Sequence, residues 1–135
     1  MALPFLDTNI FLRHLRNDHP VFSPQAHAII GRIEAGELKA RTADTVIFET
    51  VFSLQRGYKQ PRDRIAAGVL PLIELPGIIL PGKRIYRRVF ALYTSHSLGF
   101  ADCFHVALME RWGLREILSF DTDFDDIPNI HRRDG

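Results

Sequence analysis

Short apolar runs punctuate the chain and predict buried strands. They lie at positions 3–6, 78–80 and 117–120, and a further short strand is predicted around 38–41. Runs of three or four apolar residues are too short for helices, and turn formers flank several of them. The run at 78–80, for example, stands between Gly77 and Pro81. Four short strands are therefore expected, two of which end directly at an acid.

Longer stretches between these runs have apolar residues at helical spacing. Glycines and prolines give the boundaries: Pro24 suits a first helical residue, and Gly36 and Gly113 suit helix ends. In the second stretch, Ala28, Ile29 and Ile33 are expected on one buried side. The predicted helices are about 9–17, 23–34, 44–57, 61–70, 83–96 and 101–112.

This alternation of strands and helices predicts an α/β fold. Strands separated by helical stretches of about 10 to 15 residues are typical of parallel βαβ units. Neither a repeat nor a linker interrupts the pattern, so residues 1–135 are expected to form a single domain.

Composition and charge change this picture little. With 46% hydrophobic and 24% charged residues, the chain has the composition of a folded protein rather than a disordered one. A net charge of +1 gives no long-range attraction to nucleic acid, so any such binding would need a local basic patch or metal ions. One cysteine, Cys103, allows no internal disulfide. No signal peptide or membrane span is expected, which favours a cytoplasmic protein.

Two acids follow predicted strands. Asp7 comes after the first strand and Asp121 after the last. Ligands of parallel α/β sheets collect at the carboxyl ends of the strands, so these two side chains can meet in a functional site. An ordinary role is equally open, because Asp commonly caps the helix or turn that follows it.

Two further acids stand in apolar helices. Glu49 is the one acid between Val46 and Leu54, although a solvated polar face with Arg56 explains it as well. Asp102 begins a nearly apolar helix, where the helix dipole favours an acid. Its apolar flanks predict partial burial, which is costly for a carboxylate without a partner or a metal ion.

As a set, the four acids indicate a divalent-metal site. Carboxylates brought together repel one another, and a hard cation such as Mg²⁺ or Mn²⁺ relieves that repulsion. Such an ion can activate water and stabilise the charge that develops during phosphodiester hydrolysis. The acids in question are Asp7, Glu49, Asp102 and Asp121.

The order of these segments resembles the PIN-domain nucleases, and among them the VapC-type toxins of toxin–antitoxin pairs. The resemblance rests on Phe-Leu-Asp-Thr-Asn at 5–9, Glu49, Gly-Phe-Ala-Asp-Cys-Phe-His-Val-Ala at 99–107 and Ser-Phe-Asp-Thr-Asp-Phe at 119–124. It spans nearly the whole chain. It implies a three-layer sandwich in which a central parallel sheet of four to five strands has helices on both faces.

The resemblance also implies an activity and its residues. Asp7, Glu49, Asp102 and Asp121 would be catalytic metal ligands, with Asp123 as a further ligand. Asn9 and Ser119 would support these ligands through hydrogen bonds. The implied activity is Mg²⁺- or Mn²⁺-dependent endoribonuclease cleavage by a homodimer, blocked by a cognate antitoxin protein.

Basic residues supply candidate RNA contacts. Lys83, Arg84, Arg87 and Arg88 recur along one predicted helix, and Arg13 follows the first strand. Such residues add sequence-independent affinity for phosphates, but a solvated helix face explains them equally simply. His105, one turn after Asp102, is expected to be a packing residue, and the basic tail 131–135 is expected to be exposed.

Two other functions fit parts of the pattern. A haloacid-dehalogenase-like Mg²⁺-dependent phosphohydrolase would use Asp7 as a nucleophile, but position 9, where such sites have a second Asp, is Asn. A non-catalytic binding module would use the acids only as caps or partner contacts. Stabilisation by Mn²⁺ or Mg²⁺ separates that module from the nuclease.

Overall fold

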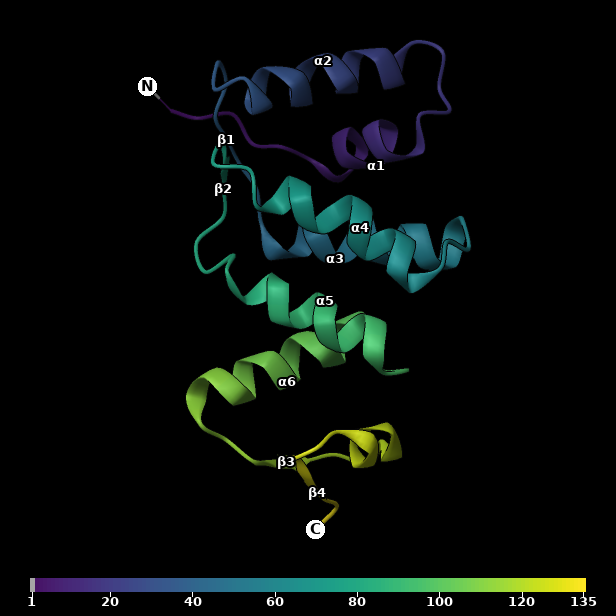
Figure 1. Ribbon diagram of the computed structural model, residues 1–135, viewed down its shortest axis with the longest axis vertical. Coiled ribbons are helices and arrows are strands. Elements are labelled where there is room, and N and C mark those ends of the chain that lie inside the picture. Colours follow the sequence, from purple (N-terminus) through teal and green to yellow (C-terminus); the bar gives the residue numbers. More distant parts are fainter. Residues whose placement is uncertain (1) are drawn as a thin grey trace. The chain divides into compact units, whose positions relative to one another are not determined.

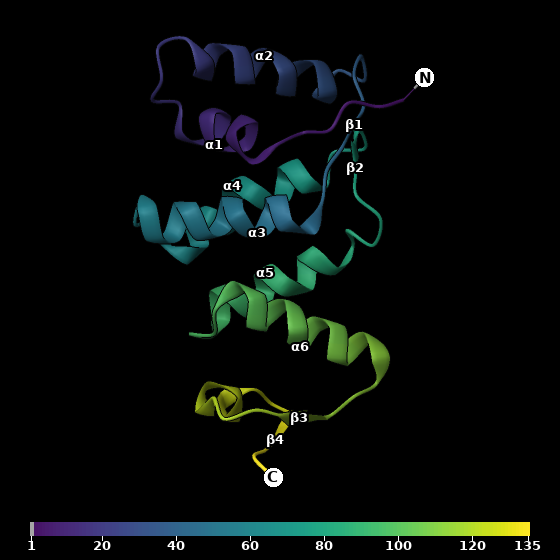
Figure 2. The same cartoon turned by 180° about the vertical axis from the view of Figure 1, so that it is seen from behind.

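The computed structural model describes residues 2–135. Its contacts divide the chain into two compact units, unit 1 up to Lys83 and unit 2 from Arg84 to Gly135 (Figures 1 and 2). Unit 1 contains α1 (Thr8–Arg16), α2 (Phe22–Glu34), β1 (Ala40–Arg41), α3 (Asp44–Phe52), the π-helical turn η1 (Ser53–Gly57), α4 (Arg62–Ile73) and β2 (Ile78–Ile79). Unit 2 contains α5 (Ile85–Ser95), α6 (Phe100–Trp112), β3 (Glu116–Leu118), the 3-10 helix η2 (Thr122–Asp126) and β4 (His131–Arg133).

Three extended segments run in parallel through unit 1. β1 pairs with β2 in the register Ala40 to Ile78, and Phe5 forms a parallel bridge to Arg41. Leu6 donates its N–H to the carbonyl oxygen of Arg41 at 2.7 Å. β1 therefore lies between the segment 4–6 and β2, and Asp7 follows directly from this set of strands. The α/β class and the parallel pairing are confirmed.

The first predicted strand differs from the expectation in its burial. Leu6 is buried, whereas Leu3 and Phe5 are largely exposed. Successive side chains of an extended segment point to opposite sides, so only one side of this short run can face the core. The apolar run therefore predicted an extended segment correctly, but fewer of its side chains are buried than we expected.

Helix α1 has nearly the predicted bounds. In α2 the buried side is not the one that was predicted. The buried side of α2 carries Ser23, Ala26, Ile30 and Ile33 rather than Ala28 and Ile29. A polar residue belongs to this side because the Ser23 hydroxyl donates to the carbonyl oxygen of Arg13 at 2.8 Å and so fastens α2 to α1. Hydrophobicity by itself could not predict that.

The core of unit 1 is mainly aliphatic. Ile30, Ile47, Val51, Ile65 and Ile78 are all at most 1% exposed. Gly77 leads into β2 at a close approach to α2, because a Cβ there would lie 2.8 Å from Cγ2 of Ile33. Glycine is needed at this position so that β2 can reach β1.

The core of unit 2 adds a cluster of aromatic rings to its aliphatic side chains. α5 packs against α6, and the rings of Tyr86, Phe90, Tyr93 and Phe100 form a cluster with centroid separations between 5.0 and 6.5 Å. Such ring separations are favourable for aromatic contacts. Cys103 on α6 is also buried, and its thiol donates to the carbonyl oxygen of Leu98 at 3.8 Å. α6 ends at Gly113, as predicted, in a left-handed conformation with φ of 71°.

One predicted boundary next to unit 2 is wrong, and one predicted segment has more structure than we expected. The predicted basic helix begins at Ile85 rather than Lys83, because the Lys83 ammonium instead donates to the carbonyl oxygens of Leu75 and Ile78. The basic tail 131–135 is largely exposed, as predicted, but part of it is also an ordered strand. Residues 131–133 form β4, which pairs in parallel with β3 from Glu116–His131 to Leu118–Arg133.

The strands are shorter than a single large sheet requires. Among residues 2–135 the structure contains two two-stranded parallel sheets, one in each unit, whose strands are two or three residues long. One central sheet of four to five strands therefore stays a prediction. Within the same range, no helix is long and apolar enough to cross a membrane.

Candidate functional site

Asp7 lies where the strands of unit 1 end and α1 begins. Its backbone is extended, with φ of −89° and ψ of 165°, which places it at the N-cap position of α1. Within the described chain its side chain makes no capping hydrogen bond, and the residue is exposed. The ordinary explanation for Asp7, a helix cap, is therefore not supported. Its carboxylate remains available for a ligand.

Glu49 is connected to this position through Thr8. The buried hydroxyl of Thr8 donates to Oε2 of Glu49 at 3.2 Å, and Thr8 follows Asp7 directly in the chain. α1 packs against α3, which carries Glu49, so the two helices hold this hydrogen bond in place. The alternative partner Arg56 instead lies with its guanidinium 5.8 Å from the ring centroid of Phe52.

Asp102 lies in the first turn of α6, and its side chain is 33% exposed. Burial raises its pKa, and the negative charges of Asp121 and Asp123 raise it further. The nearby His105, whose Nδ1 lies 3.6 Å from Oδ1 of Asp102, lowers it. Unit 2 thus brings Asp121 and Asp123 near enough to Asp102 for their charges to raise its pKa.

The turn after β3 orders Asp121. Oδ1 of Asp121 accepts from the backbone N–H of Asp123 at 2.9 Å, which caps η2. The backbone N–H of Asp121 in turn donates to Oγ of Ser119 at 3.0 Å. Asp121 therefore does act as a cap, but this bond uses one of its two oxygens. Ser119 supports the turn that holds Asp121.

The sequence analysis missed the part that His105 plays. A packing histidine was expected, but the His105 side chain is 57% exposed and forms a contact with Asp102. The spacing of three residues on one helix was the available signal, because such side chains are neighbours on a helix surface. Thr8 was missed as well, since nothing local shows that its hydroxyl reaches Glu49.

The donor set suits a hard cation. The five acids offer carboxylate oxygens, which are the ligands that Mg²⁺ and Mn²⁺ prefer. Asp7 and Glu49 belong to unit 1, whereas Asp102, Asp121 and Asp123 belong to unit 2. Between residues 2 and 135, no three His, Cys, Asp or Glu side chains form a ready-made metal-binding group. The residues fit such an ion for two reasons. Their oxygens are suitable ligands, and a cation would relieve the repulsion that raises the pKa of Asp102.

The candidate RNA-contacting arginines differ in their surroundings. Arg88 on α5 forms a two-pronged contact with Glu110, at 2.8 and 2.9 Å, and this hydrogen bonding raises its pKa. Arg13 lies 4.0 Å from Asp18. Arg84 and Arg87 are exposed at the start and on the first turn of α5. A phosphate would have to compete with Glu110 for Arg88.

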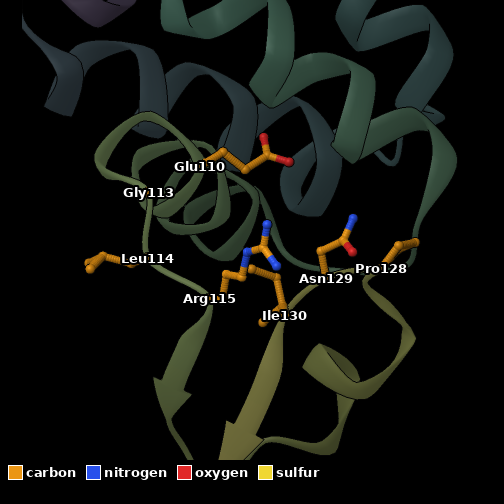
Figure 3. A pocket seen from close by; sticks show the side chains of 7 residues that line it. All are labelled: Glu110, Gly113, Leu114, Arg115, Pro128, Asn129 and Ile130. Carbon is orange, nitrogen blue, oxygen red and sulfur yellow. The ribbon is translucent and has the colours of Figure 1, made fainter.

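Each unit also has a pocket, and none of the five acids is among the residues that line either pocket. One, of about 300 Å³, lies between α1 and α2 and is lined by Asn9, Ile10, Arg13, Phe22, Gln25, Ala26 and Ile29. The other, of about 290 Å³, lies where α6 ends and where β3 and β4 begin, and Arg115 and Asn129 project into it (Figure 3). Asp102 lies in the first turn of α6, so roughly 12 Å of helix separate it from Glu110, the first residue of α6 that lines this second pocket.

Comparison with known proteins adds a relationship over nearly the whole chain. A family model described as the PIN domain matches residues 5–130, a range that includes all five acids. The chain is also similar to a VapC ribonuclease of Aquifex aeolicus (strain VF5). The two are 25% identical over 122 residues, which cover 90% of each chain.

Proposed function

We propose that this chain, which belongs to the PIN domain family, is a divalent-metal-dependent endoribonuclease that hydrolyses RNA phosphodiester bonds. The similarity to a protein named VapC ribonuclease supports the choice of RNA as substrate. In this proposal residues 1–135 act as one domain with a parallel sheet of four to five strands. Asp7, Glu49, Asp102 and Asp121 are its catalytic metal ligands, and Asp123 is a further ligand.

One observation carries the proposal. None of these five carboxylates forms an ion pair with a lysine or arginine among residues 2–135. Other acids of the chain do: Asp18, Glu110, Glu116, Asp125 and Asp134 each lie within 4.0 Å of an arginine nitrogen. Within the described residues, the proposed ligands therefore keep negative charge that no lysine or arginine within 4.0 Å neutralises, and a bound cation would neutralise it.

The protein's own residues would position and charge the site. The carboxylates would hold Mg²⁺ or Mn²⁺, an ion that supplies an activated water and stabilises charge on the phosphate oxygens. Thr8 keeps Glu49 oriented by donating to it, and Ser119 orders the turn that presents Asp121. His105 adds a proton donor beside Asp102. The side chain of Asp7 makes no capping hydrogen bond within the described chain, so both of its oxygens could bind the ion. Asn9, which lines the pocket between α1 and α2, would support the ligands as a hydrogen-bonding neighbour.

The biological setting belongs to the same proposal. The name of the relative supports a toxin of a toxin–antitoxin pair, acting in the cytoplasm as a homodimer and inhibited by an antitoxin protein. Arg13, Arg84, Arg87 and Arg88 are proposed to contact the RNA backbone. Expression without the antitoxin is expected to slow bacterial growth, and growth at the normal rate would contradict the toxin role.

The test of the activity is RNA cleavage with and without metal. Purified protein is expected to cut a labelled RNA with Mg²⁺ or Mn²⁺ and to stop when EDTA is added. Asp7→Asn should remove this activity, whereas Glu37→Gln, at an exposed acid outside the proposed site, should retain it. Metal-independent cleavage, or equal loss in both variants, would overturn the proposal.

A further inference from the structure

Two histidines meet between α1 and α2. Nδ1 of His14 on α1 lies 2.6 Å from Nδ1 of His27 on α2, and the two rings are nearly perpendicular at 74°. Nε2 of His27 lies 2.8 Å from Oδ1 of Asn17, the residue that ends α1 in a left-handed conformation with φ of 52°. The three side chains form one hydrogen-bonded chain that joins the last turn of α1 to the middle of α2.

The distances determine where the protons are. Oδ1 of Asn17 can only accept, so Nε2 of His27 donates to it. Nδ1 of a neutral His27 then has a free electron pair and accepts from Nδ1–H of His14. With both rings neutral, every one of these contacts is a hydrogen bond between a donor and an acceptor.

Proton uptake changes this balance in two steps. After one proton, a charged His27 can donate from Nδ1 to a His14 ring that carries its own hydrogen on Nε2. The contact then survives with the direction of donation reversed. After a second proton, both Nδ1 atoms are donors and both rings are positive, so a separation of 2.6 Å becomes repulsive.

We propose that the His14–His27 pair is a pH-sensitive fastening between α1 and α2, closed when the rings share at most one extra proton and opened when both are charged. The pocket between α1 and α2 is built by the same two helices, so opening the pair would change that pocket. A fall in pH would thereby change the shape of the pocket between α1 and α2 in unit 1.

The surrounding charges are compatible with this role. Burial lowers the pKa of His14, the charge of His27 lowers it further, and Glu34 on α2 raises it. Arg13 and Arg16 on α1 are both neighbours of Asp18. The remaining charged residues of α2 and of the helices next to α1 are Arg32 on α2, Asp44 and Glu49 on α3, and Arg62, Asp63 and Arg64 on α4.

The sign of the effect follows from that lowered pKa. An unfolded chain takes up a proton at His14 near the ordinary histidine pKa of 6.5, whereas folding lowers the pKa of His14, mainly through burial. The unfolded state therefore binds more protons in this window, so the free energy of unfolding falls as the pH falls. The stability present above pH 6.5 is lost progressively as the pH drops below it.

Thermal unfolding between pH 7.5 and pH 5.5 tests the pair, with EDTA present so that no metal ion bridges the rings. The Tm of the wild type is expected to fall by about 5 °C over this range. His27→Gln and His14→Gln, which cannot take up the second proton, should fall by less than about 2 °C. His131→Gln, at an exposed histidine of β4, is the matched control and should behave like the wild type.

Ring titration by nitrogen NMR of the wild type gives a second readout that needs no variant to fold. The nitrogen signals of His14 and His27 are expected to change together as the pH falls, because the two rings share one hydrogen bond. Signals of the two rings that change independently of each other would overturn the proposal, as would parallel loss of Tm in the wild type and both glutamine variants. Neither readout depends on nuclease activity.

Discussion

The two units hold their acids in different ways. In unit 1, Asp7 and Glu49 are exposed, and a neutral hydroxyl, that of Thr8, connects their surroundings. In unit 2, Asp102 is partly buried, and the neighbouring Asp121 and Asp123 raise its pKa. Repulsion from neighbouring carboxylates is therefore seen at Asp102 in unit 2, whereas the candidate ligand Glu49 of unit 1 is oriented by a neutral hydroxyl. A cation should relieve more electrostatic cost in unit 2.

The largest expected effect tests whether both units are needed. Asp7→Asn and Asp102→Asn should each reduce metal-dependent RNA cleavage by at least about 100-fold, because each removes an oxygen ligand of the ion. Single-turnover cleavage of a labelled RNA measures this. If Asp7→Asn retained full activity while Asp102→Asn lost it, the site would belong to unit 2 by itself.

Stabilisation by metal sharpens the comparison. At a concentration about ten times its Kd, Mg²⁺ or Mn²⁺ should raise the Tm of the wild type by about 4 °C. Asp121→Asn should lose most of this shift. Asp125→Asn should keep it, because Asp125 in the same turn is instead paired with Arg132 at 2.9 Å. Equal shifts in both variants would show that the ion binds elsewhere.

Loss of the supporting groups should have smaller effects. Thr8→Val keeps the buried shape but removes the hydrogen bond to Glu49, so cleavage should fall by about 10-fold. Thr45→Val, at an exposed threonine on the same helix as Glu49, is the control. A Thr8 variant with wild-type cleavage and metal affinity would remove the positioning role of this hydroxyl.

The smallest effect concerns stability without metal. Because the pKa of Asp102 is raised, the folded protein binds this proton more tightly than the unfolded chain does. The wild type therefore gains stability as the pH falls towards the ordinary value of 3.8, and the gain is lost as the pH rises through the raised pKa. In EDTA at pH 7, Asp102→Asn should raise the Tm by about 2 °C, and the difference should shrink on acidification. A Tm below that of the wild type would contradict this.

Much of the fold could be predicted because its signals are local. Asn17 and Gly113 ended α1 and α6 where the sequence indicated, since both suit the left-handed conformation of a helix end. β4 was missed because its alternation of His131, Arg132 and Arg133 contains no apolar residue. Pairing with β3, together with the contact of Arg132 with Asp125, holds this polar segment in place.

For the candidate site, the sequence predicted which acids belong to it but not the partners of their side chains. The resemblance of four segments to one family identified the acids, and the family match over residues 5–130 confirms that relationship. Their roles as ligands stay a prediction. The absence of a cap on Asp7 and the exposure of His105 could not be predicted, because side-chain partners depend on packing between helices.

By itself, the sequence determined which segments are helical, that the strands pair in parallel and which family the chain belongs to. These properties depend on backbone preferences and on motifs a few residues long. The tertiary structure decided that Thr8 reaches Glu49, 41 positions away, and that His14 meets His27. It also decided that Asp102 shares its surroundings with Asp121 and Asp123, which turns a helix-start acid into a strained carboxylate. Such contacts form only after segments that are distant in the sequence have packed together. No local stretch of sequence therefore predicts them.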